Sequence, residues 1–287
     1  MEYAIEVRNL TKRYKDFTLD DISFALPSGT VMGLIGENGA GKSTLINSIL
    51  GIADCDSQLV SMLGLDMKTH GKKIKEDIAV IFNDSHYDIN LTPKIIGHIL
   101  SKVYKNWDAA LFSGYLEKFG LPQKKKIKKM STGMRVKLEF AAALSHHPKL
   151  LILDEATSGL DPVFRDEILD ILREFTEDEG HAILMSSHIT SDLDKIADYI
   201  AYLHEGKIQF IKTYDEIRSD YGIITCGQEL FDSLSRDDIA AYKKEPYSYQ
   251  VLIKNRGKVR QVFQDIEIAN ASVEDIMLFC VKGEQVK

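Results

Sequence analysis

The chain has 287 residues, with 36 basic and 43 acidic side chains and a formal net charge of −7. Hydrophobic residues make up 44% and charged residues 28%, which is ordinary globular composition and excludes a wholly disordered or collagen-like chain. The acidic balance argues against a dedicated nucleic-acid binder, because such proteins usually carry a basic field. We therefore expect no nucleic-acid partner.

The sequence contains no obvious targeting or membrane segment. No apolar run reaches the roughly 18–20 residues that a membrane-spanning helix needs. The N-terminus carries Glu2 and Glu6 and lacks the basic start and apolar middle of a signal peptide. We therefore expect a cytoplasmic protein.

The first part of the chain is predicted to form strands that lead into a glycine-rich loop. Residues 3–35 are predicted to be strands, because apolar residues alternate with polar neighbours over residues 5–7 and again over residues 22–26. Residues 31–35 are almost fully apolar, which fits a strand buried on both faces. A helix is predicted over residues 43–50, with Gly51 as its stop.

Residues 84–147 differ in character from the rest of the chain. Strand alternation fades there, and apolar residues take helical spacing, as in the run from Ile95 to Val103. This segment is predicted to be a helical insertion.

From residue 150 the rhythm of strands and helices returns, which predicts a parallel sheet covered by helices and an α/β fold. We expect strands over 150–154 and 182–187, helices over 163–175 and 191–196, and a hairpin that turns at Glu205 and Gly206.

The last part of the chain, residues 220–287, has a small pattern of its own. Residues 231–242 are predicted to be helical, and residues 249–254 alternate as a strand does. Ser272 is predicted to cap a final helix, with Asp275 as its capping-box partner. We interpret this part as a separate α+β extension.

The glycine-rich loop carries the strongest functional signal. GENGAGKS, at residues 36–43, matches the phosphate-loop pattern G-x-x-x-x-G-K-[ST] and lies between a buried strand and a helix. Backbone N–H groups can turn inward around phosphate oxygens there, and the helix N-terminus adds a positive field. The fixed positions and the context favour a phosphate loop over an ordinary glycine turn. The predicted nucleotide-binding residues of the loop are Gly36, Asn38, Gly39, Ala40, Gly41, Lys42, Ser43 and Thr44.

Three of these side chains have distinct predicted roles. Lys42 can reach the β- and γ-phosphates, which makes it a catalytic as well as a binding residue. The hydroxyl group of Ser43 is placed to ligate Mg²⁺, and Thr44 can hydrogen-bond a nearby phosphate.

Carboxylates supply the predicted second half of the nucleotide site. LLILDE, at residues 150–155, is an apolar strand that ends in Asp154 and Glu155. Asp154 can hold Mg²⁺, usually through water, and Glu155 can orient or deprotonate the attacking water. An isolated strand of this kind would be interpreted as a plain exit into a loop, but behind a phosphate loop the functional interpretation is favoured.

His188 follows the strand at residues 182–187 and would lie at the same edge of the sheet. There it could contact the γ-phosphate or Glu155. A lone histidine is often a solvated or core residue, so its position alone leaves both interpretations open.

These residues together resemble the ATP-binding cassette (ABC) ATPases, over roughly residues 1–219. MSTGM at residues 130–134 looks like the signature motif of this family, LSGGQ, and SGLD at residues 158–161 looks like its D-loop. His188 resembles the switch histidine, and Tyr14 resembles the aromatic residue that stacks on adenine. The resemblance implies a RecA-like phosphate-loop NTPase core with an antiparallel β subdomain, and ATP and Mg²⁺ as cofactors.

The resemblance also implies a head-to-tail dimer that holds two ATP molecules between its subunits. Ser131, Gly133 and Asp161 of one subunit would then meet the nucleotide held by the other. A helix predicted over residues 134–144 could direct its N-terminal dipole at the γ-phosphate. ATP would close the dimer and hydrolysis would weaken it. Taken alone, MSTGM is also an ordinary serine-capped start of a helix.

Two positions depart from the family pattern. Thr132 stands where the signature usually has its first glycine, and its β-branched side chain limits backbone freedom. Asn83 stands where the family has a glutamine that contacts Mg²⁺ and the attacking water. Asparagine keeps the amide but is one methylene shorter. The loop could move inward, water could bridge the gap, turnover could be slow, or Asn83 could merely be a loop residue.

The helical insertion would receive a coupling helix from a membrane subunit in transporters of this family. Candidate contacts are Tyr87, Leu91, Tyr104 and Trp107, although local core packing is the better interpretation of any one of them. The basic run at residues 124–129 is interpreted as a solvated loop, with contact to anionic lipid as the weaker option.

The leading functional hypothesis is the ATP-binding and hydrolysing subunit of a bacterial ABC transporter. It would drive a separately encoded permease, as a homodimer or a heterodimer, at the inner face of the cell membrane. The resemblance to phenol-soluble-modulin and peptide-antibiotic exporter ATPases implies export of peptides, antibiotics or lipids.

The sequence leaves two alternatives open. One is a soluble ABC-type ATPase in translation or DNA maintenance, although the chain lacks a second cassette and long coiled coils. The other is a weakly hydrolysing regulatory cassette that forms a heterodimer with a more active partner. Asn83 favours this alternative, whereas Glu155 and His188 oppose it.

Overall fold

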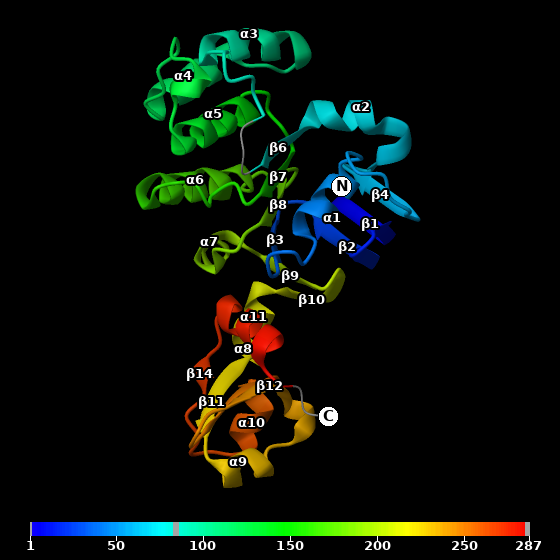
Figure 1. The fold of residues 1–287 in the computed structure, drawn as a ribbon, viewed down its shortest axis with the longest axis vertical. Helices are drawn as coiled ribbons and strands as arrows, with labels where there is room; N and C mark the ends of the chain where they lie inside the picture. Colours follow the sequence, from blue (N-terminus) through cyan, green and yellow to red (C-terminus); the bar gives the residue numbers. More distant parts are fainter. Residues whose placement is uncertain (1, 83–85, 285–287) are drawn as a thin grey trace.

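The computed structural model of the chain describes residues 2–82 and 86–284. A six-stranded sheet lies at its centre, in the order β10-β9-β3-β8-β7-β6 (Figure 1). Its strands run parallel except at the edge where β10 pairs antiparallel with β9. They are β3 (Val31–Ile35), β6 (Ile78–Phe82), β7 (Leu150–Asp154), β8 (Ala182–Ser186), β9 (Tyr199–His204) and β10 (Lys207–Thr213). The predicted mainly parallel sheet is thus confirmed.

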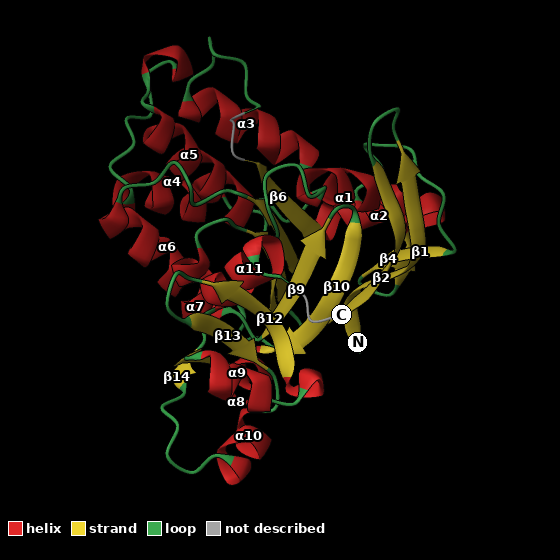
Figure 2. Cartoon of the chain, turned by 60° about the horizontal axis from the view of Figure 1, so that its bottom comes forward, coloured by secondary structure: helices red, strands yellow, loops and turns green. Residues whose placement is uncertain are grey.

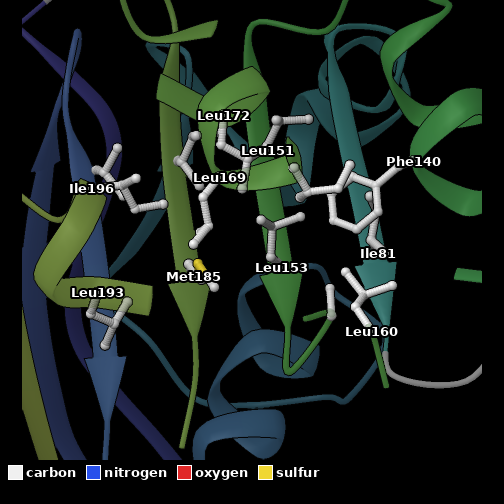
Figure 3. Close-up of a cluster of buried hydrophobic side chains, with 14 of the residues drawn as sticks. Ile81, Phe140, Leu151, Leu153, Leu160, Leu169, Leu172, Met185, Leu193 and Ile196 are labelled. Atoms are coloured by element: carbon white, nitrogen blue, oxygen red, sulfur yellow. The ribbon is translucent and has the colours of Figure 1, made fainter. Parts of the chain in front are cut away.

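The central sheet is buried on both faces, as its apolar strands predict. Along β3, Val31 and Ile35 belong to one hydrophobic core, and Met32 and Leu34 belong to the other. Helices α6 (Pro162–Phe175) and α7 (Thr190–Ile196) cover the first of these faces. Figure 3 shows Leu169 and Leu172 of α6 packed over β7 and β8, and Leu193 of α7 packed beside β3.

The second core lies between the central sheet, helix α1 (Lys42–Ile49) and an antiparallel sheet. The order of that sheet is β2-β1-β4-β5, and helix α2 (Met67–Asp77) follows it in the chain. Its strands are β1 (Tyr3–Arg13), β2 (Thr18–Pro27), β4 (Leu59–Met62) and β5 (Leu65–Asp66). This sheet is the antiparallel β subdomain that the resemblance implies.

The insertion is helical, and each α-helix begins with a side-chain cap. Thr92 caps α3 (Pro93–Val103), and Asp108 caps α4 (Ala109–Lys118). After the short 3₁₀ turn η1 (Ile127–Lys129), Ser131 caps α5 (Thr132–Leu144), which therefore starts two residues before the predicted helix. These helices lie at one end of the molecule (Figure 1).

The C-terminal residues form a smaller α+β unit at the opposite end of the molecule (Figure 1), and this unit follows α8 (Tyr214–Asp220) in the chain. Its sheet has the order β12-β13-β11-β14. The strands are β11 (Gly222–Cys226), β12 (Ile239–Lys244), β13 (Tyr249–Ile253) and β14 (Ala269–Asn270). The other elements are α9 (Gln228–Ser233), the 3₁₀ turn η2 (Arg236–Asp238), α10 (Arg256–Val262) and α11 (Val273–Lys282).

The prediction of one helix over residues 231–242 is wrong. The α-helix ends at Ser233, and strand β12 begins at Ile239. Ile239 and Ala241 are buried while the residues that alternate with them are only partly buried, which is the twofold period of a strand paired with β13. The predicted capping box of the last helix, formed by Ser272 and Asp275, is confirmed.

Helix α11 anchors this extension to the rest of the protein. Val273, Ile276 and Phe279 belong to the same core as Leu193 and Ile196 of α7. Figure 2 shows α11 between the sheet of the extension and the central sheet. The extension therefore does not have a fully separate core.

Within residues 2–82 and 86–284, no helix combines the length and apolarity needed to span a membrane.

Candidate nucleotide site

The phosphate loop lies between β3 and α1, and two of its glycines are required by close packing. A Cβ atom at Gly41, where φ is 109°, would lie 2.6 Å from the ring of Phe17. A Cβ atom at Gly36 would lie 2.3 Å from the carbonyl oxygen of Leu203. A larger residue at Gly36 would clash with backbone, and one at Gly41 would displace the ring of Phe17 and need a φ that non-glycine residues rarely adopt.

Lys42 is buried in the loop and holds the loop's own backbone. Its Nζ donates hydrogen bonds to the carbonyl oxygens of Gly36 at 2.8 Å and Glu37 at 3.1 Å. It also lies 3.7 Å from Oε1 of Glu155. Burial lowers the pKa of Lys42, while the nearby carboxylates of Glu155 and Asp154 oppose this shift. The ammonium group is therefore poorly solvated, and its charged form is stabilised by anionic groups close to it.

The carboxylates lie where β7 ends, beside the phosphate loop. Glu155 has a positive φ of 52°, which few non-glycine residues adopt, and this backbone turn follows directly after the strand. Nδ1 of His188 lies 3.4 Å from Oε2 of Glu155. The structure thus brings together Lys42, Glu155 and His188, the three residues that were predicted to be catalytic.

A cavity of about 350 Å³ opens at this point. It is lined by Phe17, Asn38, Gly39, Gly41, Lys42, Ser43, Thr44, Asp154 and Glu155. All of these residues except Phe17 are predicted from the sequence. Gly36 and Ala40 belong to the loop but do not line the cavity. Backbone N–H groups, one ammonium group and hydroxyl groups in one cavity form a suitable surface for phosphate oxygens.

The oxygen donors in this cavity suit Mg²⁺. The hydroxyl group of Ser43 and the carboxylate of Asp154 are hard oxygen ligands of the kind that Mg²⁺ prefers. Among the described residues, no cluster of three or more His, Cys, Asp or Glu side chains could hold a metal ion by itself. The donor set therefore fits a cation that nucleotide phosphates also ligate.

Tyr14, the predicted adenine-stacking residue, lies outside the cavity. Its side chain is 51% exposed, and its ring centroid lies 5.1 Å from Nζ of Lys12. Phe17 lines the cavity, although no sequence motif identifies it as a binding residue. The two residues share one turn, since the N–H of Tyr14 donates to the carbonyl oxygen of Phe17 at 2.8 Å. The sequence does place Phe17 three residues after Tyr14, so a second aromatic residue near the predicted adenine contact could have indicated it.

The signature segment and the D-loop lie against each other. A Cβ atom at Gly133 would lie 3.6 Å from the carbonyl oxygen of Gly159. Ser131 and Asp161 cap their helices, accepting backbone hydrogen bonds at 3.3 Å and 3.0 Å. None of the predicted residues Ser131, Gly133 and Asp161 lines the cavity. Asn83 lies outside the described residues.

Arg165 was also missed. Its guanidinium group donates to the carbonyl oxygens of Thr157 at 3.3 Å and Leu160 at 3.0 Å. From helix α6 it therefore holds the residue just before the D-loop and one residue within it. No local sequence pattern distinguishes this arginine from other helical arginines.

Comparison with known proteins agrees with this geometry. The ABC transporter family profile matches residues 19–158. A bacitracin transport ATP-binding protein of Enterococcus faecalis is 36% identical over 211 residues, which are 72% of this chain and 68% of that protein. A lantibiotic transport ATP-binding protein of Streptococcus pyogenes is 36% identical over 220 residues, covering 74% and 91% of the two chains.

A solved structure of the ATP-binding subunit of an ABC transporter superposes with a TM-score of 0.69 at 27% identity, covering 75% of this chain and 92% of the other. The fold, the assembled nucleotide site and these relatives lead to one conclusion. The chain belongs to the ABC transporter family, as an ATP-binding subunit and an ATPase.

Proposed function

We propose that this ATPase drives a separately encoded permease that exports peptides, peptide antibiotics or lipids. The observation that carries the ATPase part is the grouping of Lys42, Asp154, Glu155 and His188 at one edge of the sheet. Two relatives named for bacitracin and lantibiotic transport support the choice of cargo class.

In the proposed reaction, water attacks the γ-phosphate of ATP and yields ADP and phosphate. Lys42 neutralises the β- and γ-phosphates, and Glu155 orients the water, with His188 at its other oxygen. Ser43, Asp154 and, through its amide, Asn83 would hold Mg²⁺. When bound, that cation would neutralise phosphate charge. Tyr14 and Phe17 would pack beside the base and sugar.

Two copies of the chain would complete each site. Ser131, Gly133 and Asp161 lie apart from the cavity of their own chain, at the junction of the signature segment and the D-loop. In a head-to-tail dimer they would face the nucleotide of the partner chain. A homodimer and a heterodimer with a second ABC ATPase would both satisfy this arrangement.

An exposed apolar stripe supports docking to a membrane subunit. Ile95, Ile99 and Val103 follow one face of α3 and are 45%, 43% and 61% exposed. Among the contacts predicted from the sequence, Tyr87, Leu91 and Trp107 pack partly into the core. Tyr104 stacks on His146 with ring centroids 4.0 Å apart. We therefore assign the permease contact to the α3 stripe, which would place the protein at the inner face of the membrane.

The proposed domain division follows from these roles. Residues 1–219 would form the nucleotide-binding domain, with the helical subdomain at about residues 84–147. Residues 220–287 would form the α+β extension. Because α11 packs into the main core, we assign the extension a stabilising role.

Affinity purification in mild detergent tests the transporter assignment. We expect a multispan membrane protein to co-purify with the wild-type chain, and the double variant Ile95→Asp/Ile99→Asp to lose it. Val262→Asp, at a 66% exposed position on α10, is the matched control and should retain the complex. Co-purification with ribosomes in place of a membrane protein would contradict the proposal.

A further inference from the structure

One buried hydroxyl group links the two carboxylate residues of the nucleotide site. Ser186 is the last residue of β8 and is fully buried. Its Oγ donates a hydrogen bond to Oδ1 of Asp154 at 2.6 Å. The N–H of Glu155 donates to the same Oγ at 3.1 Å. A serine hydroxyl has one proton and two lone pairs, so a single group can make both contacts.

The position of this serine follows from the strand order. Strand β8 lies between β3 and β7, and Ser186 pairs in register with Leu34 on one side and with Asp154 on the other. Figure 3 shows the preceding pair, Leu153 and Met185, side by side on the two strands. Ser186 is therefore the residue of β8 that lies beside Asp154, where β7 ends.

The contact also holds a strained part of the backbone. Glu155 has a φ of 52°, which costs a non-glycine residue on the order of 1 kcal/mol. Its N–H is shared between the Oγ and the carbonyl oxygen of Ser186, both at 3.1 Å. Its own carbonyl oxygen accepts a hydrogen bond from Ser158 at 2.8 Å. Ser186 thus fixes the start of the turn that directs Glu155 toward Lys42 and His188.

We propose that Ser186 is a positioning residue that aligns Asp154 and Glu155 as one unit. Its hydrogen bond to Oδ1 fixes the orientation of the Asp154 carboxylate, and Oδ2 would then be directed to hold the cation, directly or through water. Its contact with the N–H of Glu155 fixes the backbone that carries the catalytic carboxylate. This inference rests on the proposed roles of Asp154 and Glu155 and extends them to a residue of a different strand.

Three substitutions at this position separate hydrogen bonding from packing. Ser186→Ala removes the hydroxyl group, Ser186→Cys keeps the approximate volume with only a weak S–H donor, and Ser186→Thr keeps the hydroxyl group. Ser145→Ala is the matched control. Ser145 is also fully buried, and its hydroxyl donates at 2.6 Å to the carbonyl oxygen of Ala141, outside the nucleotide cavity.

The first readout is Mn²⁺ binding in the presence of the nonhydrolysable analogue AMP-PNP, followed by electron paramagnetic resonance. The second is the division of the ATPase effect between kcat and the KM for ATP. In both Ser186→Ala and Ser186→Cys, we expect the Kd for Mn²⁺ to rise about tenfold and kcat to fall about tenfold. Changes of this size are typical when a hydrogen-bond partner of a metal-holding carboxylate is removed. The KM for ATP should change by less than about threefold, since phosphate contacts are retained.

Ser186→Thr should recover most of both quantities, and Ser145→Ala should match the wild type. Wild-type Mn²⁺ affinity and kcat in Ser186→Ala or in Ser186→Cys would overturn the proposal. The underlying assignment fails separately, if the wild-type chain itself binds no Mn²⁺ with AMP-PNP or if Glu155→Gln hydrolyses ATP normally.

Discussion

Nζ of Lys42 lies 3.7 Å from Oε1 of Glu155, so the cation of the phosphate loop pairs with the carboxylate that follows β7. The two residues are far apart in sequence and meet because β3 and β7 point their carboxyl ends to the same edge of the sheet. His188 approaches the other carboxylate oxygen of Glu155 at 3.4 Å. One ion pair therefore joins the predicted phosphate-binding and water-orienting parts of the site.

Lys42→Ala should abolish measurable ATP hydrolysis. The substitution removes the buried ammonium group that would neutralise the β- and γ-phosphates. Because this electrostatic stabilisation is lost, kcat should fall by roughly 100-fold or more. Phosphate release measured at saturating ATP checks this. Lys73→Ala, at an exposed lysine of α2, should keep wild-type activity. Normal hydrolysis by Lys42→Ala would show that the loop does not hold the phosphates as proposed.

Phe17→Ala should weaken nucleotide binding. Phe17 lines the cavity, and loss of an aromatic contact to a base or sugar costs about 1–3 kcal/mol, which corresponds to a rise in Kd of roughly 5-fold to 150-fold. Titration with a fluorescent ATP analogue measures this change. Tyr14→Ala in the same assay tests the predicted adenine stack separately. An unchanged Kd for Phe17→Ala would remove Phe17 from the binding surface.

Asp192→Asn should change how stability depends on pH. Burial raises the pKa of Asp192, which is 3% exposed, although Thr157 and Arg165 oppose the shift. The folded chain thus binds the carboxyl proton of Asp192 more tightly than the unfolded chain does. The stability that this protonation contributes is complete below the pKa of Asp192 in the unfolded chain, and it is lost as pH rises through the raised pKa in the folded chain.

The asparagine variant has no proton to lose at this position. Its melting temperature should therefore exceed that of the wild type at about pH 7, and the difference should narrow below about pH 4. Melting temperatures measured across this range by circular dichroism check the sign. A variant that is less stable at neutral pH would mean that the charged form of Asp192 is the favoured one in the fold.

Phe279→Ala should destabilise the whole protein. Phe279 is 2% exposed and joins α11 to the main core, so its truncation should cost about 3–5 kcal/mol. Val262→Ala, at an exposed position of the same extension, should stay within about 0.5 kcal/mol of the wild type. Denaturant unfolding of the full chain measures both. A small effect of Phe279→Ala would show that the extension contributes little to the core.

Local motifs made the nucleotide loop and the carboxylates predictable, because their chemistry depends on short, fixed spacings. Strand order is not encoded in such spacings. Ser186 contacts Asp154 only because β8 lies between β3 and β7, an order that tertiary pairing decides. Phe17 was missed for a similar reason, since the packing of its ring against Gly41 depends on how the β1–β2 turn folds over the loop.

The wrong helix at residues 231–242 has a comparable cause. Ile239 and Ala241 become strand residues because β13 offers them a hydrogen-bonding partner and a core. In contrast, the final helix was predicted correctly because Ser272 and Asp275 cap it through contacts within one turn.

The most direct test of the account is the oligomeric state of Glu155→Gln with and without ATP, measured by size-exclusion chromatography with light scattering. We predict a dimer in ATP and a monomer in ADP, because ATP that is not hydrolysed keeps the two chains together. The double variant Lys42→Ala/Glu155→Gln should stay monomeric in ATP. A Glu155→Gln protein that hydrolyses ATP at the wild-type rate and remains monomeric would contradict the account.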